Sequence, residues 1–503
     1  MNPRLHRWVA GGAPVLGLLG ITLWLLAPLS LEPGSRLYDA KTFNGWFLNQ
    51  PDVWLNAWIL AWDTHALSSG QVLQLFDANI YYPERGALAF SEHLLGVLPY
   101  FAPVYLATGR LALSLNLWIL LTFVLSGLAM YWVVWRWLGS RLAASVAAVT
   151  YAFAPWRFLE LSHVQLLSVQ YLPLLAYAIV RTGVRRDRRI WLAIFGLAAM
   201  QSLSSYYLGY MAFLVAGACA LLATLLARTD RFTRVLFVGS ALAAAALVMI
   251  PFSLPYLDLG ARDTFRAKVD PSLGWWPCVY YLFPRLGDSM AEAWRTWLLI
   301  PPLALLGALL GVYRRGSRAL TSGMLLAGTL GFVLALGPRA SVFGLDFGFL
   351  DRAASALVPG WQAVRVMNRF GIVCWLALSL LAGLPFALGR GGPPWWQATR
   401  RLLGSALIAA LIASSAMLEL RTMPSPEQAR DLTPYRWLAT HGGGDPLVEW
   451  PLRSSHWNAE YMYLSTLHWL PLVNGYSGYP PPSHELAFAL AEALPEPAAV
   501  RTI

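Results

Sequence analysis

A dense group of carboxylates with one imidazole lies in a polar stretch over residues 30–110, which interrupts an otherwise apolar sequence. The residues are Asp39, Asp52, Asp63, Asp77, Glu84, Glu92 and His93. A carboxylate can accept a proton from an attacking hydroxyl group, and carboxylates with an imidazole can bind a divalent cation. Packing alone does not call for so many ionisable groups, because each is costly to bury without a partner. We therefore expect the chemistry of the protein in this stretch.

Asp52 stands at the start of the segment PDVWLNAWILAWDTHAL, in which Trp54, Trp58 and Trp62 recur at helical spacing. The pattern predicts an amphipathic helix over 52–67 that lies along a membrane surface, with its tryptophans towards lipid or towards the protein. A carboxylate in the first turn of a helix is favoured by the free N–H groups there. Asp52 is therefore either a helix cap or a catalytic base.

Residues 75–96 (LFDANIYYPERGALAFSEHLLG) carry the next candidates. Asp77 could supply a second acidic function, or it could simply begin a turn. Glu92 and His93 are candidates for substrate contacts; being adjacent, they would point in different directions on a helix and would not both bind one ion. His93 could instead cap a membrane helix. A cation such as Mg²⁺ or Mn²⁺ is compatible with this donor set, and the sequence leaves the use of a metal open.

A third group of candidates lies in GWQAVRVMNRF, residues 360–370, directly before an apolar run. Arg365, Asn368 and Arg369 fall on the side of the membrane where basic residues are not expected. A guanidinium group offers a planar fork for phosphate, so these residues could bind a lipid phosphate. The alternative is that they reach into the lipid headgroups without a specific ligand.

The composition defines the class of protein that must position these residues. Hydrophobic residues make up 57% of the 503 and charged residues 13%, and the mean hydropathy is +0.52. A soluble domain carries about 25% charged residues. The net charge of +11 comes from arginines in short clusters between apolar runs, which is typical of cytoplasmic loops and excludes a nucleic-acid surface. We predict an all-α polytopic membrane protein.

About eleven apolar segments are predicted to cross the membrane. They are 9–29, 111–135, 141–155, 164–181, 190–204, 206–227, 235–256, 294–312, 319–336, 370–388 and 402–418. With the arginine clusters inside, the N-terminus is cytoplasmic, the C-terminus is external and every long polar segment lies outside. Residues 94–107 are apolar but are broken by prolines, so we expect a juxtamembrane or re-entrant element there.

The sequence changes character after the last predicted span. Residues 1–418 form the expected transmembrane domain with its first outer loop at 30–110, and residues 419–503 form an external C-terminal segment. Turn formers separate short apolar runs in this segment, and DPLVEWPL is predicted to be a strand. We expect a small outer α/β segment, and an end at Ile503 is compatible with a truncated outer domain.

Taken together, these features resemble a known superfamily. A large first outer loop with an early acidic residue, juxtamembrane helices, many spans and an outer C-terminal segment resemble the GT-C glycosyltransferases, the integral-membrane enzymes related to protein O-mannosyltransferases. More narrowly, NAWILAWDTHAL, LFDANIYYPERGALAFSEHLLG, RVMNRFG and HWLPLVNGYSGYPPP resemble a group of bacterial membrane proteins placed with that superfamily.

The resemblance implies a site and a reaction. Its acidic residue matches Asp52 best, although Asp52-Val53-Trp54 replaces the common Asp-Glu-Tyr sequence; Asp39 is the fallback. The implied partners are a polyprenyl-phosphate sugar donor, membrane lipid and an unidentified acceptor, at the outer face of a bacterial cytoplasmic membrane. Two other classes stay open: a lipid or polysaccharide transporter or flippase, and a non-catalytic membrane scaffold with the same fold.

Overall fold

The structure is a computed structural model that describes most of the chain and is predominantly helical. It describes residues 3–39, 50–261, 295–314, 316–338, 341–342, 345–387, 392–418, 420–452 and 455–493. In these residues, the β-strands form two short antiparallel pairs. They are β1 (Arg36–Tyr38) with β4 (Thr422–Pro424), and β2 (Ser341–Val342) with β3 (Leu345–Asp346).

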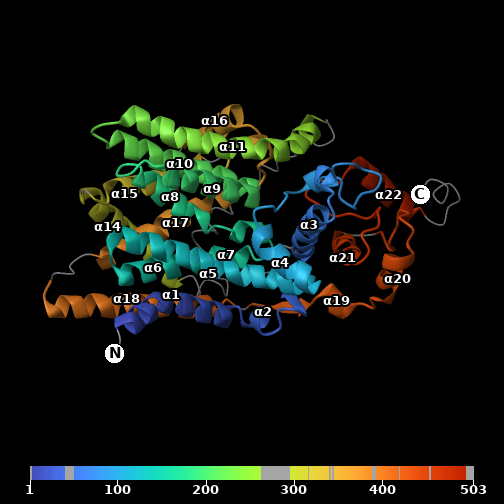
Figure 1. Cartoon of the computed structure of the whole chain (residues 1–503), viewed down its shortest axis with the longest axis horizontal. Helices are drawn as coiled ribbons and strands as arrows, with labels where there is room; N and C mark the ends of the chain where they lie inside the picture. The colour runs from blue at the N-terminus through green and yellow to red at the C-terminus, as the bar shows by residue number, and fades with distance from the viewer. Residues whose placement is uncertain are drawn as a thin grey trace.

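A bundle of long helices forms the body of the molecule (Figure 1). Its elements are α1 (Pro3–Leu25), α5 (Leu111–Leu138), α6 (Arg141–Ala152), α7 (Pro155–Leu159), η4 (Val164–Leu167), α8 (Tyr171–Arg181), α9 (Arg188–Ser204), α10 (Tyr206–Leu225), α11 (Arg231–Ala261), η7 (Thr296–Leu299), α14 (Ile300–Tyr313), α15 (Arg318–Ala335), η9 (Met367–Phe370), α17 (Gly371–Ala382), η10 (Leu384–Ala387) and α18 (Pro394–Ala416). Each of the eleven predicted segments contains a helix. Within the described residues, eight helical segments are long and apolar enough to span a membrane, so an all-α polytopic protein is confirmed. The count of eleven crossings stays a prediction.

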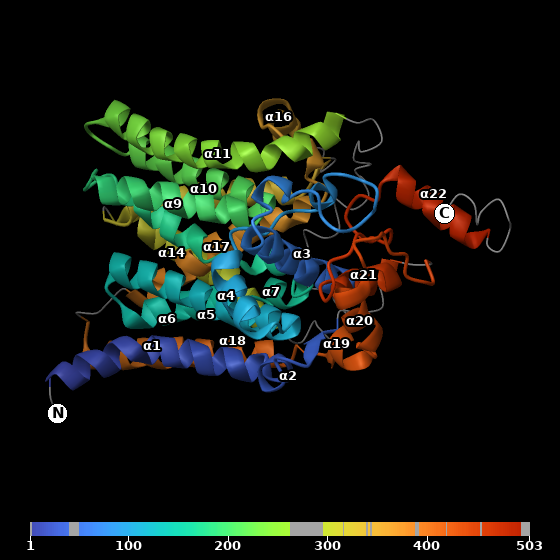
Figure 2. The ribbon, with the colours of Figure 1, turned by 45° about the vertical axis from the view of Figure 1, so that its right-hand side comes forward.

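The arginine-rich connections gather at one end of the bundle, opposite α3 (Figures 1 and 2). Arg186, between α8 and α9, contacts Asp230, between α10 and α11, at 2.9 Å, so these two connections lie side by side. Asp187 caps α9 by accepting the backbone N–H of Ile190. The structure thus separates an arginine-rich end from an end that carries the first polar loop and the C-terminal segment.

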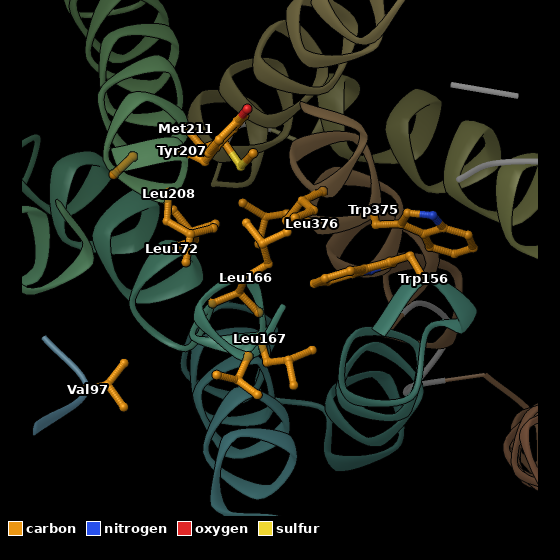
Figure 3. Close-up of a cluster of buried hydrophobic side chains, with 14 of the residues drawn as sticks. Val97, Trp156, Leu166, Leu167, Leu172, Tyr207, Leu208, Met211, Trp375 and Leu376 are labelled. Atoms are coloured by element: carbon orange, nitrogen blue, oxygen red, sulfur yellow. The ribbon is translucent and has the colours of Figure 1, made fainter. Parts of the chain in front are cut away.

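The centre of the bundle is a continuous apolar core. Figure 3 shows part of it, including Leu166, Leu208 and Trp375, which are all buried. Trp297 meets Trp375 edge-on with ring centroids 5.8 Å apart. Gly307 lies where α14 passes so close to α17 that a Cβ atom would collide with the chain there. This dense packing fixes the helix ends from which the candidate residues project.

The opposite end carries a layer of short elements. They are α2 (Ala27–Leu31), α3 (Gln50–Ser68), η2 (Val72–Gln74), η3 (Ala87–Phe90), α4 (Leu98–Thr108), α16 (Phe349–Leu357), η8 (Trp361–Ala363), α19 (Pro426–Ala429), α20 (Thr433–His441), α21 (Ser455–Ser465) and α22 (Pro482–Glu492). The pairing of β1 with β4 ties the start of the first polar loop to the start of the C-terminal segment. Figure 2 shows α3 between the bundle and α21, against which it packs.

The helix predicted over 52–67 is present as α3, but it is not amphipathic. Trp54, Trp58 and Trp62 are at most 4% exposed, and most of the remaining residues of α3 are buried as well. Because α4 and α21 both pack on α3, the tryptophans face the protein, which is one of the two alternatives left open by the sequence. The indole N–H of Trp62 donates to the carbonyl of Leu75, so this tryptophan is fixed within the protein. The predicted helix is confirmed, with its tryptophans towards the protein, whereas the prediction that it is amphipathic and lies at a surface is wrong.

Two further expectations concern residues 94–107 and the C-terminal segment. Residues 94–107 contain the short helix α4 with Pro103 inside it, and its place relative to the membrane stays a prediction. DPLVEWPL forms a single parallel bridge, between Leu447 and Leu472, instead of a strand. The reason is that the N–H of Glu449 donates to the side chain of Asn474 at 2.7 Å and not to a neighbouring backbone. The described part of 419–503 is therefore helices and loops, with β4 paired to the first loop.

Candidate active site

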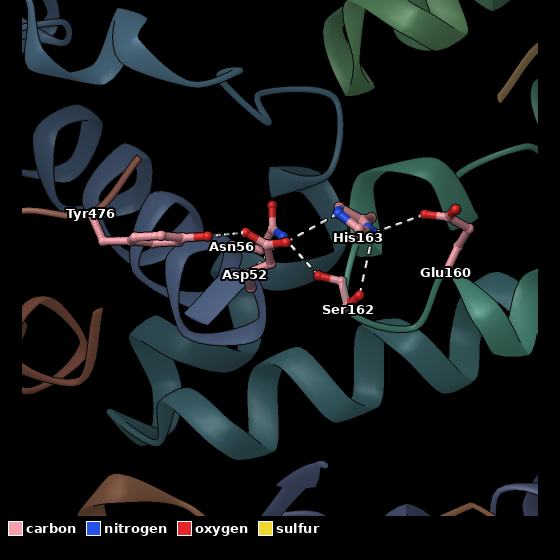
Figure 4. A network of polar contacts seen from close by, with 6 residues as sticks. All are labelled: Asp52, Asn56, Glu160, Ser162, His163 and Tyr476. Carbon is pink, nitrogen blue, oxygen red and sulfur yellow. Dashed lines mark hydrogen bonds and ion pairs between the residues drawn. The ribbon is translucent and has the colours of Figure 1, made fainter. Parts of the chain in front are cut away.

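Asp52 lies in the first turn of α3 and joins three parts of the chain (Figure 4). Its Oδ1 accepts a hydrogen bond from the hydroxyl of Tyr476 at 2.8 Å, and its Oδ2 lies 3.2 Å from Nε2 of His163. One turn further on, the amide of Asn56 donates to the carbonyls of Asp52 and Ser162, at 2.8 and 2.9 Å. The carboxylate is thus held by the first polar loop, the connection between α7 and α8, and the C-terminal segment.

His163 sits between two carboxylates. Its Nδ1 lies 2.8 Å from Oε2 of Glu160, on the side away from Asp52. Burial by itself would lower the pKa of His163, but Glu160 and the hydrogen bond to Asp52 outweigh burial and the opposing charge of Arg369, and they raise the pKa to about 9. The ring is therefore an imidazolium at neutral pH and can donate to both carboxylates.

The same contacts keep Asp52 ionised. Burial would raise the pKa of this carboxyl group, yet the pKa lies below its ordinary value. The hydrogen bond and charge of His163, the hydroxyl of Tyr476 and the charge of Arg369 together overcome the burial. Burial and the neighbouring Asp52 raise the pKa of Tyr476, so its hydroxyl stays a neutral donor. An ionised, four-fifths buried carboxylate is a group that can accept a proton from a bound alcohol.

Glu92 occupies the start of α10. Its carboxylate accepts hydrogen bonds from the hydroxyl of Ser205, at 3.1 and 2.9 Å, and from the backbone N–H groups of Tyr206 and Tyr207, at 2.8 and 3.4 Å. Burial raises the pKa of Glu92, and the charge of Arg369 opposes the rise. Glu92 therefore holds the N-terminus of α10 in place, and with it Tyr207, whose ring contacts Arg369.

Arg369 connects these groups electrostatically. Its guanidinium carbon lies 4.8 Å from the ring centroid of Tyr207, and the residue is 9% exposed. Its charge acts on Asp52, His163 and Glu92 alike. Arg369, from η9, is thus the cation among Asp52, the imidazolium of His163 and Glu92, and its guanidinium is the group here that could contact a phosphate.

Arg365 borders this group of residues through the C-terminal segment. Its guanidinium donates to the carbonyl of Gly478 at 2.9 Å and lies 4.4 Å from the ring centroid of Tyr479. A Cβ atom at Gly478 would lie 2.8 Å from the guanidinium, so a larger residue there would make the end of the Arg365 side chain shift. Asn368 is buried in η9 beside Arg369. The loop that contacts Arg365 is the one that brings Tyr476 to Asp52.

The structure thus brings together Asp52, Glu92 and Arg369, with Arg365 and Asn368 at the border, and leaves two other predicted residues apart. Asp77 accepts the backbone N–H of Gly86 at 2.8 Å, which supports the alternative that it organises a turn. His93 is buried among aromatic rings, with no hydrogen-bond partner for its ring nitrogens among the described residues. Burial lowers the pKa of His93 to about 3, so the ring is neutral.

The sequence analysis missed His163, Glu160 and Tyr476. The first two lie in the short connection between two predicted spans, on the predicted outer side, where an acidic residue three positions before a histidine was a usable signal. Tyr476 lies in NGYSGYPPP, which contributed to the resemblance but carried no predicted role. Among the described residues, no group of three or more histidine, cysteine, aspartate or glutamate side chains is arranged to hold a metal ion.

Fold and site together define a polytopic helical membrane protein with an ordered acidic site at one end of its bundle. The structure is similar to that of the arabinofuranosyltransferase AftD from mycobacteria, with a TM-score of 0.51 and 17% identity. The match covers 88% of this chain and 29% of AftD, so the chain spans less than a third of that protein's length. No protein-family model matches the sequence, and no curated protein is significantly similar to it. The likeness to AftD is therefore one of fold.

Proposed function

We propose that this protein is a membrane glycosyltransferase. It moves a sugar from a polyprenyl-phosphate donor to an acceptor hydroxyl at the outer face of a bacterial cytoplasmic membrane. The observation that carries this proposal is the environment of Asp52: an ionised carboxylate near the cation Arg369, at the end of the bundle opposite the arginine-rich connections, in a fold similar to that of AftD. A base and a phosphate-binding cation are the two groups that such a transfer needs.

The reaction would be a single displacement. The acceptor oxygen attacks the anomeric carbon, the bond from that carbon to the phosphate oxygen breaks, and the polyprenyl phosphate leaves with the bonding electrons. The acceptor proton passes to Asp52. Because hydrogen bonds hold the pKa of Asp52 low, it is a weak base, and we expect proton transfer after the new bond has begun to form and has made the hydroxyl acidic.

The other residues have supporting roles. Arg369 stabilises the negative charge that develops on the leaving phosphate, and it requires no reorganisation because it already rests on Tyr207. His163 and Tyr476 orient the two oxygens of Asp52, and Glu160 balances the charge of the imidazolium. Glu92 keeps the start of α10, and with it the ring under Arg369, in place.

The proposal is tested with the purified full-length protein in lipid nanodiscs. The protein is incubated with radiolabelled polyprenyl-phosphate pentoses and hexoses and a membrane extract as acceptor source, and sugar transfer is measured. Wild-type protein should transfer at least one of these sugars. Asp52→Asn should lose about 10²–10⁴-fold of the rate. The matched control Asp445→Asn, which changes an exposed carboxylate of the C-terminal segment, should retain it. Equal rates in both variants would refute the role of Asp52.

A further inference from the structure

A second feature, near the first polar loop, lies on the surface of the bundle. Helix α11 runs along the edge of the bundle (Figures 1 and 2), and only 22% of its most apolar 18-residue stretch is buried within the protein. Towards its end, Leu254 and Leu257 are 57% and 56% exposed. Pro251 and Pro255 lie inside this part of the helix, where each removes a backbone N–H donor.

Between this part of α11 and the first polar loop lies a cavity of about 630 Å³. Its walls are mostly apolar and include Leu73 and Phe76 from the loop and Phe252, Leu254 and Leu259 from α11. This volume falls in the range of small-molecule sites in proteins, about 300–1,000 Å³. A cavity that opens beside exposed leucines of a membrane-length helix is accessible to an acyl chain, and each buried methylene group of such a chain contributes to binding.

Three charged residues also line the cavity: Asp77, Arg85 and Asp258. The carboxylate of Asp77 is held in place by the backbone N–H of Gly86 at 2.8 Å. Two carboxylates and one guanidinium complement a head group that carries both a phosphate and an ammonium ion. A head group with only negative charge would meet two like charges and one opposite charge.

The cavity is separate from the Asp52 site. Phe76 and Phe252 form its inner wall and pack against the buried ring of His93, at centroid distances of 6.4 and 5.5 Å. Since that ring is neutral and has no hydrogen-bond partner among the described residues, the wall is an apolar barrier between the cavity and Glu92. A lipid held here would be a resident of the protein and not a reactant.

We propose that this cavity binds a zwitterionic aminophospholipid of the surrounding leaflet. One acyl chain lies along the apolar wall, the phosphate contacts Arg85, and the primary ammonium group contacts Asp77 and Asp258. The proposal does not depend on the sugar-transfer reaction, so either can fail without the other. It gives Asp77 a role that differs from the second acidic function predicted from the sequence.

Native mass spectrometry of the full-length protein tests the proposal. The protein is taken from nanodiscs that contain equal amounts of phosphatidylethanolamine and phosphatidylglycerol with identical acyl chains. We expect one phosphatidylethanolamine to be retained with a preference of about fivefold to tenfold. Leu254→Trp places an indole in the cavity and should abolish this retention. Leu257→Trp, an equally exposed position on the same helix that does not line the cavity, should leave it unchanged.

The charges are tested separately. The double substitution Asp77→Asn with Asp258→Asn should remove the preference for phosphatidylethanolamine, because both partners of the ammonium group are lost, while the fold is monitored by thermal unfolding. Equal retention of the two lipids by the wild-type protein would overturn the proposal. So would an equal loss in Leu254→Trp and Leu257→Trp, or an unchanged preference in the double variant.

Discussion

Replacement of His163 by glutamine should change how the stability of the protein depends on pH. The imidazole lies outside the membrane-length helices, between Asp52 and Glu160, and these carboxylates raise its pKa from 6.5 to about 9. A raised pKa means that the folded state binds the proton more tightly than the unfolded state does. The stabilisation is therefore complete below about pH 6.5 and is lost as the pH rises towards 9.

The size of the effect follows from the same two values. The difference between 6.5 and about 9 corresponds to about 3 kcal/mol, which is an upper bound because the side chain is 19% exposed. The wild-type protein should thus lose about 1–3 kcal/mol of unfolding free energy between pH 6.5 and 9 through this group. His163→Gln keeps an amide that can donate to Asp52 but cannot titrate, so this part of the loss should be absent.

The assay is equilibrium unfolding in mixed detergent micelles with increasing dodecyl sulfate, at pH 6, 7, 8 and 9.5. We expect His163→Gln to be less stable than the wild type at pH 6 and the gap to close by pH 9.5. His441→Gln, which changes an exposed histidine of the C-terminal segment, serves as the control and should follow the wild type. A gap that stays constant with pH would refute the reasoning, because it would mean that the ring is not charged in the folded protein.

Three other predictions follow from the geometry. Tyr476→Phe removes one hydrogen bond to Asp52 and should lower kcat for sugar transfer about tenfold while KM for the donor changes little, with kcat and KM measured separately for the wild type and the variant; an unchanged kcat would contradict the role of Tyr476. Glu92→Gln loses the charge at the start of α10 and should lower the unfolding free energy by about 1 kcal/mol, since its amide can still accept from the backbone N–H groups; no loss would contradict the capping role. The exposed positions Ser69 and Thr440, substituted by cysteine, should react with an impermeant maleimide from outside, whereas Thr229→Cys should react only from the cytoplasm; the reverse pattern would overturn the predicted orientation.

The class of fold could be predicted from the sequence because the pattern that indicates it, apolar runs alternating with arginine clusters, repeats along the whole chain. Apolar runs long enough to cross a membrane and arginine clusters between them were sufficient to locate a helix in each predicted segment. The environment of α3 could not be predicted in this way. Its tryptophans have the same spacing whether they face lipid or the protein, and only the packing of α21 on α3 decides between the two.

The candidate site shows the same limit. Asp52 could be proposed because it starts a predicted helix in the first polar loop and best matches the acidic residue of the superfamily that the sequence resembles. His163 and Tyr476 lie 111 and 424 positions further along the chain, and neither has a local pattern that points to Asp52. Asp77 and His93 fitted the expected chemistry by residue type, but a turn and an aromatic enclosure hold them elsewhere. Residue type indicates what a side chain can do, whereas tertiary contacts decide where it does it.

The central claim is that Asp52 accepts the proton of the acceptor during sugar transfer, and single-turnover kinetics test it most directly. Wild-type protein and Asp52→Asn are each saturated with a polyprenyl-phosphate sugar that the wild type uses, donor binding is measured separately, and transfer is started by adding acceptor. We predict that the two proteins bind the donor with similar Kd and that the transfer step in Asp52→Asn is about 10²–10⁴-fold slower. A transfer step at the wild-type rate in Asp52→Asn, with donor bound, would contradict the claim.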